Sequence, residues 1–115
     1  MDRAFYSASC SGHANYFMYK PVSTVISARR AGTTATYDQL NKYFGITQMP
    51  IISSRYWNMV HGSKPEEVLQ DEEGMQVMRI LGKNMAYFLK CIEAGKMNNV
   101  LLPTQEKTTF TNFIR

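Results

Sequence analysis

Two adjacent arginines, a glycine and two threonines stand where an apolar segment gives way to a helix-like one. Arg29 and Arg30 can stabilise negative charge on a ligand, and Gly32 lets a backbone approach a ligand closely because it has no Cβ. Thr33 and Thr34 offer hydroxyls and amides at the start of a helix. The pattern suits a ligand-binding loop, but a solvated arginine pair ahead of a helix cap would have the same residues.

Aromatic and imidazole side chains form a second group of candidates. Tyr56 and Trp57 follow a predicted strand at residues 49–53, so their rings can pack on a planar ligand or fill a surface groove. His61 and His13 are able to donate protons, although a lone loop histidine is more often structural or solvated. We therefore assign no catalytic residue from the sequence.

Several kinds of chemistry are not supported by the spacing of residues. The chain has no paired carboxylates, no Ser-His-Asp ordering and no GxGxxG motif, so neither hydrolysis nor a Rossmann dinucleotide site is indicated. Cys10 and Cys91 lie far apart without zinc spacing, so we expect no metal site and reduced thiols. The 13 Lys and Arg residues are scattered despite a net charge of +4, which argues against a nucleic-acid partner.

The sequence also gives an expectation for the cellular location of the protein. Its first six residues lack the basic and apolar regions of a signal peptide, and no stretch approaches the roughly 20 apolar residues that cross a bilayer. We expect a cytoplasmic protein without a membrane partner.

The elements that must position these residues can be read from apolar periodicity. Residues 22–27 are β-branched and suit a buried strand. A helix should follow, capped by Thr33 or Thr34 and ended by Gly45, with Tyr37, Leu40 and Phe44 as its apolar stripe. A second strand is predicted at 49–53, and residues 54–68 form a long connection.

The longest predicted helix begins near Pro65 or after Leu69, runs to about Ala94 and is ended by Gly95. One face of it should pack on the sheet through a stripe of apolar residues: Met75, Met78, Leu81, Met85, Leu89 and Ile92. Residues 1–95 then form one structural unit, and 96–115 form an extended arm.

Alternating strands and helices predict an α/β fold with a parallel sheet. Ligands bind such sheets at the carboxyl ends of the strands, which is where the Arg29–Arg30 loop falls. Two strands make too small a sheet to cover two helices and leave both edges open, so we expect further strands.

Several segments resemble, in order and spacing, the C-terminal half of the NADPH-dependent FMN reductase family, which is related to the iron-sulfur flavoproteins. The matching segments are MDRAFYS, KPVSTVISARRAGTTATYDQLNKYFGI, MPIISSRYWNMVHG, DEEGMQVMRILGKNMAYFLKCIEAGK and TNFIR. The resemblance implies a partial flavodoxin-like fold, a doubly wound parallel sheet to which this chain gives the last two strands and last helices. Residues 22–28 and 49–53 would be strands four and five, 33–44 and roughly 70–94 the following helices, and strands one to three would precede Met1.

The resemblance also implies the ligands and the site. FMN would be the cofactor and NAD(P)H the co-substrate, and the chain would be a fragment of an NAD(P)H-dependent oxidoreductase that transfers electrons through FMN. Tyr56 and Trp57 would pack on the flavin ring, and the phosphate loop would precede Met1. The loop at the isoalloxazine edge would comprise Ser27, Ala28, Arg29, Arg30, Ala31, Gly32, Thr33 and Thr34.

Other interpretations stay open at this point. The parent could be a flavodoxin-like or iron-sulfur flavoprotein electron carrier, or the chain could be a truncated product that is inactive by itself. The resemblance implies a homo-oligomeric parent, either a dimer or a tetramer, and the chain alone should hold little FMN.

Overall fold

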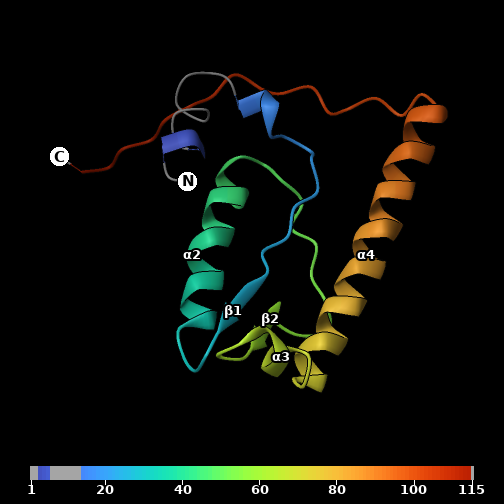
Figure 1. The fold of residues 1–115 in the computed structure, drawn as a ribbon. Coiled ribbons are helices and arrows are strands. Elements are labelled where there is room, and N and C mark those ends of the chain that lie inside the picture. The colour runs from blue at the N-terminus through green and yellow to red at the C-terminus, as the bar shows by residue number, and fades with distance from the viewer. Residues whose placement is uncertain (1–2, 6–13, 115) are drawn as a thin grey trace.

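A computed structural model describes residues 3–5 and 14–114 of the chain (Figure 1). Residues 3–5 are helical. The elements that follow are, in order, η1 (Ala14–Tyr16), β1 (Ile26–Ala28), α2 (Thr33–Ile46), β2 (Met59–His61), α3 (Pro65–Val68) and α4 (Glu72–Met97). Cys10 and His13 lie outside the described residues.

The two strands form a parallel pair, as predicted for an α/β fold. Ile26 is opposite Met59 and Ala28 is opposite His61. Earlier in both segments, Val22 forms an isolated parallel bridge with Ile51. Helices α2 and α4 lie on either side of these strands in Figure 1, with α2 packed on β1 and α4 packed on β2.

The strand predicted at 49–53 was misplaced. Of this segment only Ile51 pairs, through its bridge to Val22, and the regular strand β2 lies inside the predicted connection 54–68. The paired points are four residues apart in the first segment but eight apart in the second, so the second segment must leave the sheet between them. We call the residues that do so, 53–57, the excursion. Periodicity missed β2 because three residues are too few to establish an alternation.

Helix α2 begins differently from the prediction. Its N-cap is Gly32, in the left-handed region at φ 92°, and no side chain of the described residues caps it, so neither Thr33 nor Thr34 does so. The Thr36 hydroxyl donates to the Gly32 carbonyl at 2.8 Å. The helix also continues through Gly45, which was expected to end it, to Ile46.

The longest helix starts after Leu69, which is one of the two predicted starts, but it ends later than predicted. Of the two predicted starts, Pro65 begins the separate helix α3, while α4 follows its N-cap Asp71. At the other end α4 passes Gly95 and stops in a Schellman arrangement, in which Val100 N–H donates to the Gly95 carbonyl at 2.9 Å and Asn99 has φ 57°. The left-handed residue after this helix is therefore Asn99, whereas the sequence predicted that Gly95 would end the helix.

The core is built from the strand segments, α2 and the N-terminal half of α4. Its buried apolar residues are Ile26, Phe44, Ile52, Val60, Val77 and Leu81. On α4 the buried positions are Gly74, Val77 and Leu81, so Leu81 confirms one position of the predicted stripe. The stripe's Met75, Met78, Met85 and Ile92 are half-buried, and the buried face is shifted toward Gly74 and Val77. Leu89 belonged to that stripe, yet it is 50% exposed.

The C-terminal part of the described chain is open to solvent. Tyr87, Phe88 and Met97 of α4 are exposed, and residues 100–114 have neither helix nor strand and are exposed throughout. Among the helices of the described residues, none combines the length and the apolar character needed to cross a bilayer.

Two leucines of α4 test which face is buried. Leu81→Ala should lower the free energy of unfolding by about 2–4 kcal/mol because it removes a buried side chain and leaves a cavity. Leu89→Ala makes the same chemical change at an exposed position and should cost about 0.5 kcal/mol or less. Denaturant titration measures both values, and equal losses would contradict this packing.

Candidate functional site

The carboxyl ends of β1 and β2 lie at one edge of the sheet. Ala28 ends β1 and His61 ends β2, and the next residue, Gly62, donates its N–H to the Ala28 carbonyl at 3.2 Å. The loop from Arg29 to Gly32 leaves the sheet at this edge. His61 therefore lies at the same edge as the loop that the sequence singled out.

The loop is open to solvent. Arg29, Arg30, Gly32 and Thr34 are exposed, while Thr33 is buried at the start of α2. A Cβ at Gly32 would meet no heavy atom within 4 Å, so the space over this stretch of backbone is free among the described residues. An anion could approach the first amides of α2 here, beside two guanidinium groups.

The start of α4 cannot receive an anion in the same way, because a carboxylate already occupies it. Asp71 Oδ1 accepts from the Gly74 N–H at 2.9 Å, and Oδ2 accepts from the His61 N–H at 2.8 Å. The His61 Nδ1 atom is 3.8 Å from Oδ2. One carboxylate thus ties the end of β2 to the start of α4.

These contacts change the acidity of Asp71. The Gly74 N–H, followed by the His61 N–H, stabilises the carboxylate and lowers the pKa of Asp71 below its ordinary 3.8, although partial burial opposes the shift. Gly74 also has to be small, since a Cβ there would collide with the Asp71 carboxylate and come within 3.0 Å of Val60.

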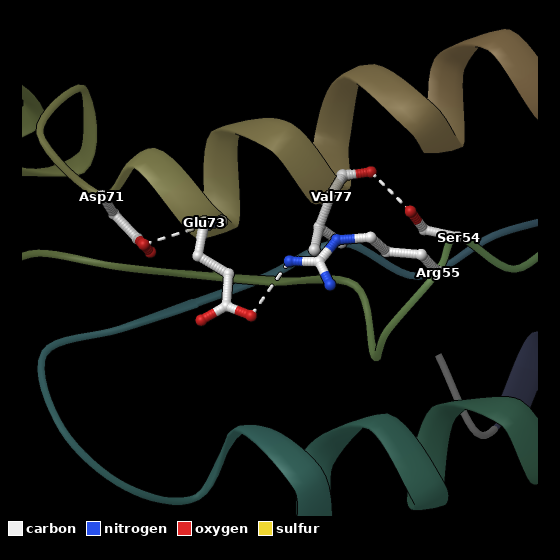
Figure 2. A network of polar contacts seen from close by, with 6 residues as sticks. Ser54, Arg55, Asp71, Glu73 and Val77 are labelled. Atoms are coloured by element: carbon white, nitrogen blue, oxygen red, sulfur yellow. Dashed lines mark hydrogen bonds and ion pairs between the residues drawn. The ribbon is translucent and has the colours of Figure 1, made fainter.

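Polar contacts hold the excursion against α4, as Figure 2 shows. The Ser54 hydroxyl donates to the Val77 carbonyl at 2.7 Å, and Arg55 pairs with Glu73 at 3.1 Å. Farther along α4, the Asn84 side-chain amide donates to the Ser53 carbonyl at 2.8 Å. The excursion is therefore anchored on one helix along much of its length.

The residue after the excursion is buried. Asn58 is 1% exposed, and its amide donates to the Ser23 hydroxyl at 2.8 Å. Its carbonyl accepts from the Ile26 N–H at 3.0 Å, which returns the segment to the sheet. Its side-chain Oδ1 is buried and has no hydrogen-bond partner among the described residues.

Two cavities flank the excursion. The first, of about 360 Å³, is lined by Tyr37, Ser53, Ser54, Arg55, Tyr56 and Trp57. The second, of about 560 Å³, is lined by Arg55, Leu69, Glu72, Glu73, Met75, Gln76 and Arg79. Arg55 belongs to both. A smaller cavity of about 70 Å³ has Tyr56, His61 and Asp71 in its wall.

The structure divides the predicted site residues into two groups. Residues 27–34 lie at the end of β1, and none of them lines the three cavities. Tyr56 and Trp57 lie before β2, as a T-shaped pair with centroids 4.6 Å apart, and line the first cavity. Tyr37, one turn after Thr33 on α2, connects the two groups in sequence.

Sequence reasoning missed the roles of two residues. The order Asp71-Glu-Glu-Gly, with acids directly after an aspartate, is a signal for a helix N-cap and could have identified the Asp71 cap. Nothing in the sequence indicates that Arg55 pairs with Glu73, because 18 residues separate them.

Comparisons with known protein families, curated proteins and solved structures give no match to this chain. Within the described part of the chain, no cluster of three or more His, Cys, Asp or Glu side chains is arranged to hold a metal ion. Cys91 is a free, exposed thiol.

Asp71 predicts a pH dependence of stability. Because its pKa is lowered in the folded state, its contribution is complete above its ordinary pKa of 3.8 and is lost as the pH falls through the folded value. Asp71→Asn should lower the free energy of unfolding by about 1 kcal/mol near neutral pH, because a side-chain amide has one acceptor oxygen and cannot accept from both the His61 and the Gly74 N–H. The difference from the wild type should shrink in acid.

Denaturant titrations over a range of pH measure this difference. Asp38→Asn makes the same chemical change at an exposed position of α2 and is the matched control. A difference between Asp71→Asn and the wild type that stays constant down to the lowest pH would show that Asp71 does not titrate as described.

Proposed function

We propose that the chain is part of an FMN-dependent NAD(P)H oxidoreductase, with residues 27–34 at the edge of the flavin. The observation that carries the proposal is the Arg29–Gly32 loop at the carboxyl end of a parallel strand. In doubly wound sheets this is where ligands bind. The sequence resemblance to the FMN reductase family supports the same function.

The residues of the loop fit one edge of such a cofactor. The backbone at Gly32 is open to a close approach, and the uncapped start of α2 offers amide donors to a negatively charged group. Arg29 and Arg30 are exposed beside it. The acid-capped start of α4 would instead repel an anion.

When bound, FMN would supply the hydride-accepting ring. The chain's own contribution would be position and electrostatics. The guanidinium groups of Arg29 and Arg30 would stabilise negative charge at the ring edge, and the amides of Thr33 and Thr34 would orient it through hydrogen bonds. The fixed backbone of β1 would hold the loop in register with the end of β2.

Flavin retention tests the proposal. The longest product of the gene that contains this chain should purify with FMN, visible in its absorbance, and should oxidise NAD(P)H. Replacing both Arg29 and Arg30 by Gln should weaken FMN binding about tenfold, because two charge-assisted contacts are lost. Replacing Lys83 and Lys90 by Gln removes the same charge from α4 and should leave FMN binding unchanged.

The outcomes separate the alternatives. FMN retention without NAD(P)H oxidation would favour an electron carrier over an oxidoreductase. A product that neither retains FMN nor binds it when it is added would refute the proposal. Equal effects of the arginine pair and the lysine pair would mean that overall charge, rather than this loop, governs binding.

A further inference from the structure

We propose that the cavity of about 560 Å³ beside the N-terminal half of α4 binds a short peptide with free amino and carboxyl ends. Most of its wall comes from the first two turns of α4, and Arg55 of the excursion also lines it. Its volume is within the range of small-molecule pockets. No residue of the Arg29–Gly32 loop lines it, and the inference goes beyond the flavin site proposed there.

The charges in the wall of the cavity favour a ligand that carries both signs. Arg55 and Glu73 offset each other, because they form an ion pair at 3.1 Å (Figure 2). Glu72 and Arg79 are exposed, and neither side chain has an ionic or hydrogen-bond partner among the described residues. A ligand with a single charge would be attracted by one of these two groups and repelled by the other, whereas a zwitterion is attracted by both.

The spacing of the two free charges sets the length of the ligand. Glu72, Gln76 and Arg79 follow one another at four and three residues, so they lie on the same face of α4. At 1.5 Å per residue, Glu72 and Arg79 are about 10 Å apart along the helix axis. An extended peptide spans about 3.3–3.6 Å per residue, so the two ends of a tripeptide are separated by about the same distance. A single amino acid is too short to contact both.

The residues between the two charges match the middle of a peptide. Gln76 carries an amide donor and an amide acceptor, which are the groups that pair with a peptide bond. Met75 and Leu69 also line the cavity, so they offer apolar surface to a side chain of the ligand. We therefore place the ammonium end of the peptide at Glu72 and its carboxylate end at Arg79.

Titration of the full chain with alanyl-leucyl-alanine tests the proposal. In two-dimensional NMR spectra the backbone amide signals of residues 72–79 should shift and reach saturation. The N-acetylated peptide lacks the ammonium group and the C-amidated peptide lacks the carboxylate, so each should bind about fivefold more weakly. Free leucine keeps both charges but cannot reach both side chains, so it should lose about as much affinity.

Two variants assign the ends of the peptide. Arg79→Gln should weaken binding of the free peptide about fivefold but leave binding of the C-amidated peptide unchanged, because that peptide has no carboxylate. Glu72→Gln should weaken the free peptide equally and leave the N-acetylated peptide unchanged. Lys90→Gln and Glu93→Gln make the same changes of charge farther along α4, outside this cavity, and should not alter binding. All four side chains are exposed, and circular dichroism checks that each variant is folded.

Several results would overturn the inference. They are no saturable shift with the tripeptide, equal binding of the free and the end-blocked peptides, and a loss in Arg79→Gln that is as large for the C-amidated peptide as for the free one. Inorganic phosphate that binds more tightly than the tripeptide would indicate an anion site and would also overturn it. FMN plays no part in this measurement, so failure of the cavity and failure of the flavin loop are distinguishable.

Discussion

The Asp71 carboxylate joins the end of β2 to the start of α4, and the placement of α4 follows from this contact. It accepts backbone N–H groups from His61 and Gly74, so both oxygens are used. A carboxylate shared between a strand and a helix ties the first turn of α4 to β2, and the buried Val77 and Leu81 lie on the packed face that continues from it. A Cβ at position 74 would collide with the Asp71 carboxylate and stand 3.0 Å from Val60, so glycine lets the first turn of α4 lie close to β2.

The position of α4 then determines how the excursion lies. With Gly74 against β2, the Val77 carbonyl meets the Ser54 hydroxyl and Glu73 meets Arg55. Residues that leave the sheet would otherwise have only solvent to satisfy their polar groups. These contacts order the excursion against α4, and its residues line two cavities.

Local patterns in the sequence predicted much of the fold, while contacts between distant residues could not be read from it. The Tyr37-Leu40-Phe44 stripe predicted α2 to within two residues of its end, because helix periodicity is local. β2 was missed, since its three residues become a strand only by pairing with β1. The arginine loop was correctly placed at the end of a strand. The cavity at Trp57 could not be predicted, because it forms only where Tyr37 of α2 comes near the excursion.

The Arg29–Gly32 loop and the excursion rest on different supports. The loop is positioned by β1, α2 and the left-handed Gly32, while the excursion is held on α4 through Ser54 and Arg55. Tyr37 of α2 lines the cavity at Tyr56 and Trp57. A change that rotates α4 should therefore move the excursion while leaving the loop nearly intact, so any coupling between the two has to pass through α2 or the β1–β2 pairing.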